Sequence, residues 1–475
     1  MSKNNVLIIM SDEHTRSVMG AYGNAQAITP NLDRLAARGA RFEKAYTPSP
    51  ICIPARCSFA TGTQVFEHRC WSSAEPYYGQ QQSWMHRLRE QGNEVVSIGK
   101  LHYRSAGDDV GFSESIKPMY LANNGMGWPQ GLQRKPMCDF PEAAELAAEL
   151  GPGESSYTQY DREVTREAVN WLGKQSSSQC EKPWVLFVSF VSPHFPLTAP
   201  TAFYDLYRDV ELPKAYDVDP VKQLKHPVID EMREFWNYND YFDDQKQLEG
   251  LRNYYGLCSF LDDNVRQVLE ALEASGESDN TQIIYTSDHG DMIGNHGIWC
   301  KSYMYEDSVG IPLTLTGPGI VPSVNTTPVS LVDIAATVES FVSDEYRLAG
   351  QGWAGRPLQK FVESPDPDRV VISEYHDGGS PTGFFMLRKG EWKLVYFAEG
   401  HPPLLFNMKD DPRELNNLAN ECSDVCQQLI ESLHTVLDPE AVNQQAFADQ
   451  AKMIEKLGGI EKIRQMRSFN HTPLD

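Results

Sequence analysis

Long hydrophobic runs are missing from this sequence. No apolar stretch approaches the ~20 residues that a membrane-spanning helix needs. The apolar segment nearest the N-terminus, residues 6–10, is too short for the core of a secretory signal peptide, and no small-residue cleavage site follows it. We therefore expect a cytoplasmic protein that makes no membrane contact.

Positive charge is also scarce. The chain has 42 Lys and Arg residues against 65 Asp and Glu residues, which gives a net charge of −23. Nucleic-acid binding needs clustered basic side chains, so the composition argues against a nucleic-acid partner. Any site for an anion has to be locally positive against this background.

The cysteines form no regular framework. There are nine of them, an odd number, and in a long chain without a secretory signal most are expected to be buried thiols. Cys422 and Cys426 lie four residues apart on an expected helix, but no second Cys or His pair is near enough in sequence to predict a zinc site.

What the sequence does contain is an alternation of strands and helices. This pattern predicts an α/β fold with a large, mostly parallel (mixed) sheet that is flanked by helices on both faces. The expected strands of this sheet are residues 5–10, 94–98, 184–191, 283–286, 311–315 and 370–374. The segment 105–155 is rich in Gly, Pro and Asn, which indicates a long surface excursion of the kind that shapes a pocket.

The pattern changes near residue 380. A hairpin over 384–396 with its turn at Lys389-Gly390, a strand at 404–406 and a helix at 422–437 predict a small C-terminal antiparallel sheet subdomain with a packed helix. The expected domains are 1–375 (N-terminal α/β catalytic domain), 376–440 (antiparallel subdomain) and 441–475 (a polar, partly helical tail).

Four chemically active residues each follow one of the expected strands. They are Asp12, Lys100, His194 and Asp288. One acid or one histidine at such a place is most often a solvated loop residue or a turn residue. Four of them are a stronger signal, because the carboxyl ends of parallel strands meet at one edge, where α/β proteins bind ligands.

The residue types at these ends suit a metal and an anion. Asp12 and Asp288, with Glu13 and His289 beside them, can bind one divalent cation, and an imidazole at 289 is more usual for manganese or zinc than for calcium. Five cationic or proton-carrying side chains can surround an anion, and the histidines among them can also move protons. These five are Arg56, Lys100, His102, His194 and Lys301.

The most specific motif is Cys52-x-Pro54-x-Arg56, which is closed by Thr61-Gly62. Alone, it also fits a cysteine in a tight turn before a helix. Together with the strand-end residues it resembles the signature of the sulfatase family, in the alkaline phosphatase superfamily. The resemblance spans nearly the whole chain, and it is nearest to choline-sulfatase-like and phosphonate monoester hydrolase-like members. It implies an alkaline phosphatase-like fold.

The resemblance implies a metal site that includes Cys52. In the family this cysteine is oxidised to Cα-formylglycine, whose hydrate is the nucleophile. Asp12, Cys52, Asp288 and His289 would bind one divalent metal ion, with Glu13 as a further ligand. Glu13 stands where the family usually has Asp. His289 stands where the family often has Asn, and the phosphonate hydrolases also have His at this position. These departures leave the metal (Ca²⁺ or Mn²⁺) and the ligand role of Glu13 open.

The resemblance also implies roles for the five side chains around the anion. Arg56 and Lys100 would hold the formylglycine hydrate, and His102 would drive release of the aldehyde. His194 and Lys301 would grip the sulfate and help to protonate the leaving oxygen. The implied partners are a small sulfate-ester substrate and a formylglycine-generating enzyme, and we expect a homo-oligomer.

Three functions are compatible with the sequence. The leading one is hydrolysis of sulfate monoesters, and the alternatives are a phosphonate monoester hydrolase or phosphodiesterase on the same scaffold and a silent binding protein whose cysteine is never converted. Some aromatic residues close in sequence to the site can line a leaving-group pocket or belong equally to the core. They are Trp71, Tyr78, Trp299 and Tyr303.

Overall fold

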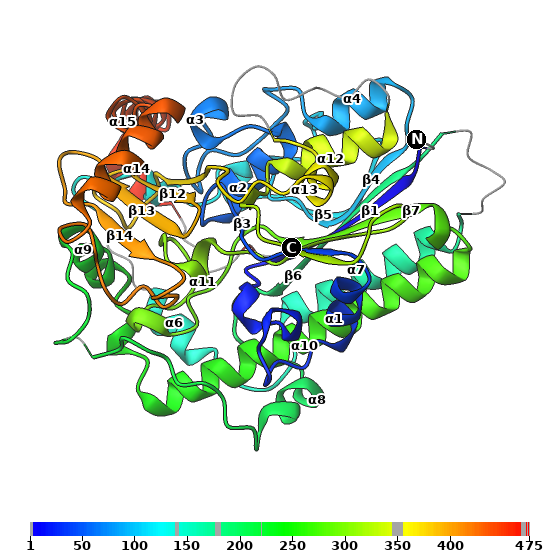
Figure 1. The fold of residues 1–475 in the computed structure, drawn as a ribbon, viewed down its shortest axis with the longest axis horizontal. Coiled ribbons are helices and arrows are strands. Elements are labelled where there is room, and N and C mark those ends of the chain that lie inside the picture. The colour runs from blue at the N-terminus through cyan, green and yellow to red at the C-terminus, as the bar shows by residue number, and fades with distance from the viewer. Residues whose placement is uncertain are drawn as a thin grey trace.

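The fold is built on one large sheet, seen edge-on in Figure 1. The computed structural model describes residues 3–137, 142–175, 182–219, 221–343 and 355–466, together with 472 and 474. Eight strands form this sheet in the order β5-β4-β6-β1-β7-β8-β2-β9. Their bounds are β5 Glu114–Met119, β4 Val95–Lys100, β6 Val185–Pro193, β1 Asn5–Asp12, β7 Thr281–Ser287, β8 Leu313–Thr316, β2 Ala40–Phe42 and β9 Ser323–Asn325.

The centre of the sheet is parallel and one flank is mixed. β4, β6, β1 and β7 run in the same direction, whereas β8 is antiparallel to both β7 and β2. Every residue of β1, β6 and β7 is buried, as expected for strands that are covered on both faces. The predicted fold class is therefore confirmed.

Successive side chains of β1 point to opposite faces of the large sheet, and each face packs into a core of its own. Val6, Ile8 and Met10 belong to one core, and Leu7 and Ile9 belong to the other. Helices cover both faces of the sheet (Figure 1). One face carries α2 (Cys52–Thr61), α4 (Trp84–Glu90) and α12 (Asp333–Val342), and the opposite face carries α1 (Pro30–Ala37), α7 (Ser156–Leu172) and α10 (Asp244–Ser275).

A second, antiparallel sheet of four strands packs against helix α14 (Ser423–Val436). Its strands are β11 Val371–Tyr375, β12 Phe384–Lys389, β13 Trp392–Phe397 and β14 Leu404–Asn407. The predicted hairpin and its turn are present. The assignment of residues 370–374 to the large sheet is wrong, because β11 pairs with β12. This C-terminal sheet therefore begins before residue 376. The sequence did not indicate this, because a short apolar run does not reveal which sheet it joins.

The segment 105–155 also differs from the prediction. It contains β5, which pairs with β4 at the edge of the large sheet, as well as α5 (Ala122–Gly125) and α6 (Glu142–Ala148). β5 was not predicted because most of its side chains are partly or fully exposed and it includes Pro118. The remaining described elements of at least two residues, apart from 3-10 turns, are β3 Ala45–Tyr46, β10 Val329–Ser330, α3 Val65–His68, α8 Thr201–Tyr204, α9 Pro227–Trp236, α11 Glu306–Val309, α13 Leu358–Glu363, α15 Pro439–Lys456 and α16 Ile460–Arg464.

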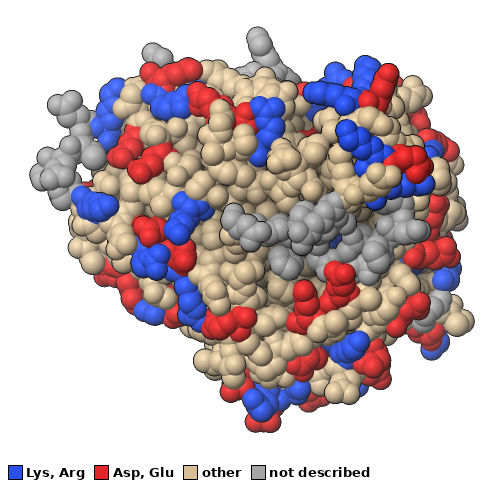
Figure 2. All heavy atoms as spheres, turned by 180° about the vertical axis from the view of Figure 1, so that it is seen from behind, with Lys and Arg blue, Asp and Glu red and all other residues tan. Residues whose placement is uncertain are grey.

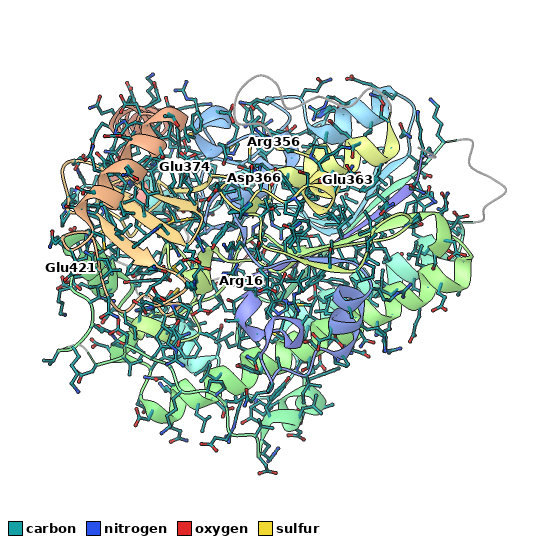
Figure 3. The ribbon with its side chains drawn as sticks, viewed as in Figure 1. Arg16, Arg356, Glu363, Asp366, Glu374 and Glu421 are labelled. Carbon is teal, nitrogen blue, oxygen red and sulfur yellow. The ribbon has the colours of Figure 1, made fainter. Side chains whose placement is uncertain are left out.

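A buried ion cluster joins the two sheets. Arg16, labelled in Figure 3, contacts Glu306 of α11, and Lys393 of β13 lies 3.0 Å from Glu306 and 2.7 Å from Glu414. Removing Lys393 would leave the buried carboxyl group of Glu414 without its cationic partner, and breaking a buried pair in this way typically costs about 3–5 kcal/mol. The C-terminal sheet is therefore held firmly against the region that follows β7.

The surface agrees with the acidic composition. On the face shown in Figure 2, basic side chains lie among acidic ones, and the described residues form no continuous basic surface there. None of the described helices combines the length and the apolar character needed to cross a bilayer.

Candidate active site

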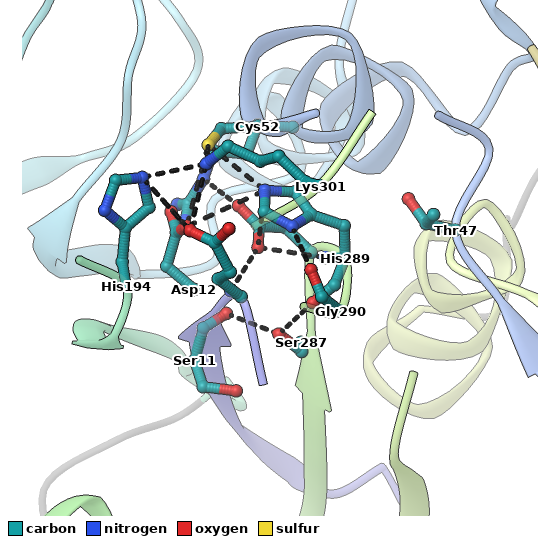
Figure 4. Close-up of polar contacts among 12 residues, drawn as sticks. Ser11, Asp12, Thr47, Cys52, His194, Ser287, His289, Gly290 and Lys301 are labelled. Atoms are coloured by element: carbon teal, nitrogen blue, oxygen red, sulfur yellow. Dashed lines mark hydrogen bonds and ion pairs between the residues drawn. The ribbon is translucent and has the colours of Figure 1, made fainter. Parts of the chain in front are cut away.

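The site lies at the carboxyl ends of the central parallel strands (Figure 4). In the pairing of β1 with its neighbours, Asp12 is opposite Pro193 of β6, and Ser11 is opposite Ser287 of β7. His194 and Asp288 come directly after these two strands, so the sheet itself places them beside Asp12. The structure therefore brings these strand ends together, as predicted.

Cys52 is the first residue of α2, and its side chain faces these strand ends. Its sulfur lies 3.2 Å from Nε2 of His289 and 3.6 Å from Oδ1 of Asp12. Asp12, Cys52, Asp288 and His289 each bring one possible ligand atom to within 4.8 Å of the others, and all four residues are buried. The structure thus assembles the four predicted metal ligands in one group.

The imidazole of His289 is oriented for metal binding. Its Nδ1 lies 3.0 Å from the carbonyl oxygen of Gly290, so Nδ1 carries the proton that is donated to this oxygen. The lone pair of Nε2 then points toward Cys52 and the two carboxylates. A backbone carbonyl that fixes the tautomer in this way is typical of metal-binding histidines, so the donor set fits a divalent cation.

Arg56 and Lys100 neutralise the two carboxylates. Arg56 lies 2.8 Å from Asp288 and 3.0 Å from Asp12, and Lys100 lies 2.6 Å from Asp12. Burial would raise the pKa of Asp12, but Lys100, His194, Arg56 and Lys301 hold it well below its ordinary value. Both cations contact the carboxylates in this structure, at the side of the group that faces the sheet.

The thiol of Cys52 is not activated by these charges. Burial and the nearby Asp12 raise its pKa to about 12, so an unmodified Cys52 stays a neutral thiol near pH 7. A neutral thiol is a poor nucleophile.

Lys301 and His194 lie on the other side of Cys52. The ammonium of Lys301 donates to Sγ of Cys52 at 3.3 Å, to Nε2 of His194 at 2.8 Å and to Oε2 of Glu13 at 3.1 Å. The Nδ1 of His194 donates to the carbonyl oxygen of Phe195 at 2.7 Å. Burial, together with Lys301 and Lys100, lowers the pKa of His194 well below its ordinary value, so the ring is neutral and accepts from Lys301.

Glu13 lies apart from the group of four. It clusters with Asp12 and His194, and also with Asp291 and Cys300. Burial raises the pKa of its carboxyl to about 8, although the ammonium of Lys301 opposes this shift. Whether Glu13 binds the metal stays a prediction. The structure places it with Lys301 and His194, which are predicted to surround the anion.

His102 comes two residues after the end of β4, and its side chain is buried. Its Nε2 is 3.0 Å from the hydroxyl of Thr472, and its buried Nδ1 has no hydrogen-bond partner among the described residues. Burial and the charges of Lys100 and Arg56 lower its pKa well below the ordinary value. His102 is therefore a neutral imidazole with one nitrogen available for a proton.

A cavity of about 170 Å³ opens next to these residues. Cys52, His102, His194 and Lys301 line its inner end, and Thr472 also contributes to its wall. Most of the remaining lining is apolar, with five aromatic side chains from separate segments. These are Trp128, Phe195, Trp236, Tyr238 and Tyr375.

Asp377 is the one acidic residue among the described lining residues. Its carboxylate accepts from the backbone N–H of Ser73 at 2.9 Å, from the hydroxyl of Ser73 at 2.5 Å and from the N–H of Gly378 at 2.8 Å. Burial nevertheless raises the pKa of Asp377 above its ordinary value. The cavity thus presents a single fixed acidic group within an aromatic wall.

The structure places the four aromatic residues predicted for the pocket elsewhere. Trp71 donates to Asp449 of α15, and Tyr78 is 42% exposed under the guanidinium of Arg104. Trp299 stacks on Phe242, and the buried Tyr303 lines a separate, smaller cavity. None of these four lines the cavity in the described part of the chain, because nearness in sequence to a site residue does not determine where a side chain points.

The true lining residues were missed for an identifiable reason. Asp377 comes two residues after β11, so the rule of polar residues at strand ends would have found it. Trp236 and Tyr238 are neighbours at the end of α9 and in the following 3-10 turn, whereas the other three aromatic residues come from a loop and from strand ends that no spacing in the sequence connects.

The comparisons with known proteins agree with this geometry. The family model "Sulfatase" matches residues 4–341, and the model "N-sulphoglucosamine sulphohydrolase, C-terminal" matches residues 294–442. The choline-sulfatase of Rhizobium meliloti is 33% identical over 432 residues, which are 88% of this chain and 82% of that protein. Arylsulfatase K of Danio rerio is 28% identical over 458 residues, which are 93% of this chain and 85% of that protein.

Solved structures share the fold. The phosphonate monoester hydrolase of Agrobacterium radiobacter superposes with a TM-score of 0.71 at 22% identity, covering 91% of this chain and 95% of that one. A 2-O GAG sulfatase superposes with a TM-score of 0.70 at 20% identity, covering 98% and 97%. At these identities the likeness is one of fold alone. The family match over more than half of the chain shows that this protein belongs to the sulfatase family and is a sulfuric ester hydrolase.

Proposed function

We propose that this chain hydrolyses small sulfate monoesters with a formylglycine made from Cys52 and with one divalent metal ion held by Asp12, Cys52, Asp288 and His289. The observation that carries the proposal is the position of Cys52. Its side chain stands at the start of α2, between the carboxylates of the strand ends and the ammonium of Lys301. A nucleophile for sulfate-ester cleavage has to lie between a metal site and a cationic acid.

Each absent group supplies one kind of chemistry. Hydrated formylglycine provides an attacking hydroxyl and a second hydroxyl that later expels sulfate. A metal held by these residues would supply positive charge to offset the negative charge that develops on the sulfate. The site fits both, because the sulfur of Cys52 occupies the place of the attacking oxygen, and Nε2 of His289 is free to bind.

Lys301 and His194 are the proposed acid pair. Lys301 contacts Sγ of Cys52, the atom that marks the nucleophile, and its other partners are the neutral ring of His194 and the carboxyl group of Glu13. The ammonium can therefore hold a sulfate oxygen and deliver a proton to the departing ester oxygen, while Nε2 of His194 supports it. Such general acid catalysis typically contributes about 10²–10⁴-fold.

His102 is the proposed base for release of sulfate. It lines the same cavity as Cys52, and its Nδ1 has no partner in the described structure. A neutral imidazole there can take a proton when the second hydroxyl re-forms the aldehyde. Arg56 and Lys100 keep the carboxylate of Asp12 ionised, since both lie within 3.0 Å of it.

The cavity wall supports a compact leaving group that is apolar or positively charged. Trp128, Trp236 and Tyr238 offer aromatic faces, and the carboxylate of Asp377 adds a negative charge at the same wall. Aromatic faces with a carboxylate are suited to quaternary ammonium groups. The 33% identity to a choline-sulfatase supports the same substrate class.

A second function, hydrolysis of phosphonate monoesters or phosphodiesters, is favoured by one observation. An imidazole, His289, belongs to the metal group, and the family resemblance associates this residue with the phosphonate hydrolases. The shared fold agrees with this alternative but does not favour it over sulfate.

One experiment separates these functions. The chain is co-expressed with a formylglycine-generating enzyme, purified and assayed with choline sulfate, an aryl sulfate, an aryl phosphonate monoester and an aryl phosphodiester. We expect the highest kcat/KM for a sulfate ester, with choline sulfate exceeding the uncharged aryl sulfate. A preference for the phosphonate ester would assign the second function, and a fully converted enzyme that is inactive toward all four would contradict both.

A further inference from the structure

Two cysteines outside the catalytic group lie against each other. Cys57 is in the middle of α2, and Cys70 follows α3, thirteen residues later in the chain. Their sulfur atoms are 3.0 Å apart, and both residues are buried. Neither side chain contacts the cavity or belongs to the metal group, so the proposed catalytic mechanism does not use them.

The two sulfurs have different chemical environments. The thiol of Cys57 donates to the sulfur of Cys70, and the side-chain amide of Gln80 donates to the same sulfur at 3.2 Å. The hydrogen bond from Cys57 is the main cause that lowers the pKa of Cys70 to about 6, whereas burial raises the pKa of Cys57 well above its ordinary value. A thiolate next to a neutral thiol is the arrangement that reacts with oxidants.

A metal site is the competing interpretation of this cluster, since His68 brings a third possible ligand to within 4.8 Å of both sulfurs. However, both ring nitrogens of His68 are already engaged. Nδ1 accepts from the backbone N–H of Cys70 at 3.0 Å, and Nε2 lies 2.8 Å from the hydroxyl of Ser58. Without the lone pair of His68, two sulfurs are too few for a closed metal site of the usual kind.

Small oxidants have a route to Cys70. Gln80, whose amide covers the sulfur, is an exposed residue, and its carbonyl oxygen accepts from the N–H of Tyr78 on the protein surface. Both cysteines belong to the same core, but Cys57 is 0% exposed and Cys70, the one that Gln80 contacts, is 2% exposed, so a movement of Gln80 is the expected route for a small oxidant. Cys70 is thus the sulfur that is oxidised first, and Cys57 is the one that resolves.

We propose that Cys57 and Cys70 form a reversible disulfide when the protein meets a peroxide. The thiolate of Cys70 attacks one oxygen of hydrogen peroxide and, with one proton taken up, gives a sulfenic acid and water. The thiol of Cys57 then displaces the hydroxyl from this sulfenic acid, which forms the S–S bond and releases a second water. The two thiols lose two electrons and the peroxide gains them, and a dithiol reductant reverses the reaction by thiol–disulfide exchange.

The bond would connect the nucleophile helix to the wall of the cavity. Cys57 lies five residues after Cys52 on α2, and three residues after Cys70 the backbone and hydroxyl of Ser73 hold the carboxylate of Asp377. Closing this loop reduces the freedom of the unfolded chain, so the oxidised protein is expected to unfold at a higher temperature.

Mass spectrometry tests the bond directly. Trypsin cuts after Arg56, Arg69 and Arg87, so Cys57 and Cys70 fall on separate peptides, 57–69 and 70–87, and neither contains another cysteine. The folded, converted enzyme is treated with excess hydrogen peroxide, alkylated and digested without reduction. We expect these two peptides to be linked with a loss of about 2 Da, and to separate after dithiothreitol.

Two variants complete the test. Cys57→Ser should abolish the linked peptide and the rise in melting temperature that peroxide causes, while Cys422→Ser should preserve both. Both variants should keep the basal activity of the reduced enzyme. Separate alkylated peptides after peroxide treatment, a link from Cys70 to a different cysteine, or a stoichiometric metal that is lost on Cys57→Ser would each overturn the proposal. All of these readouts are independent of the sulfatase mechanism.

Discussion

The charged residues at the strand ends and the aromatic residues that line the cavity meet at Cys52, but different parts of the fold position them. The charged group comes from the ends of neighbouring parallel strands, whose register fixes Asp12, His194 and Asp288 relative to one another. The wall comes from loops, a short helix and the start of the C-terminal sheet. We infer from this difference that the strand ends position a large part of the reacting group and that the connecting segments determine which leaving group is accepted.

The largest effect that would support this division is the loss of activity in Cys52→Ala. The substitution removes the precursor of the nucleophile, while α2 keeps Pro54 near its start and the rest of its packing. We expect kcat/KM on an aryl sulfate to fall to roughly a few per cent or less of the original value. Cys57→Ala on the same helix is the matched control and should stay active.

The next effect concerns the carboxylates. Asp288→Asn removes one of the two charges that face the metal group and leaves the guanidinium of Arg56 with one carboxylate fewer. We expect kcat/KM to fall on the order of 10²–10³-fold together with metal occupancy, measured by elemental analysis. Full occupancy in this variant, with a melting temperature near that of the original chain, would contradict the ligand assignment.

The acid pair should show a graded effect. Lys301→Ala and His194→Ala should lower kcat/KM by about 10²–10⁴-fold for alkyl sulfates, because an alkoxide needs a full proton when it leaves. The loss should be smaller for nitrophenyl sulfates, whose leaving groups need little protonation. The measurement is kcat/KM across a series of leaving groups, and an equal loss throughout would mean that both residues only bind sulfate.

For Asp377, in the wall of the cavity, we expect a loss of activity that differs between substrates. Asp377→Asn keeps the shape of the side chain and removes its charge, so kcat/KM for choline sulfate should fall by ~10-fold while the value for an uncharged aryl sulfate changes little. The comparison of the two substrates is the readout. Equal losses would show that Asp377 acts on the reaction or on the fold.

The smallest effect is expected at Trp71, a residue that the sequence alone suggested for the pocket. Its indole N–H donates to Asp449, and its ring packs against His376. Trp71→Phe should therefore cost about 1 kcal/mol of folding free energy through the lost hydrogen bond and leave kcat/KM for both substrates nearly unchanged. A loss of kcat/KM on choline sulfate alone would indicate that Trp71 belongs to the substrate site.

These two regions also differ in how far the sequence could predict them. Asp12, Lys100, His194 and Asp288 were placed correctly because a strand that is buried on both faces reads as an apolar run, and its end is visible in the sequence. The contact of Arg56 with Asp288 was not predicted, because the sequence assigned Arg56 to the anion and the contact depends on how α2 packs against the strand ends.

The remaining features depend on tertiary packing. The edge strand β5 has an exposed, mixed pattern, and β11 is an apolar run that gives no sign of which sheet it joins. Trp128 and Trp236 reach the cavity from segments that are more than a hundred residues apart, so no local pattern could have linked them.

The most direct test of the central claim is the relation between conversion of Cys52 and activity. Preparations made with increasing amounts of converting enzyme are digested with trypsin, and the peptide 45–56, which contains Cys52 as its only cysteine, is quantified by mass. Conversion to formylglycine lowers the mass of this peptide by about 18 Da. The account predicts that kcat on an aryl sulfate rises in proportion to the converted fraction and extrapolates to zero without it. Full activity in a preparation whose Cys52 is entirely unmodified would contradict it.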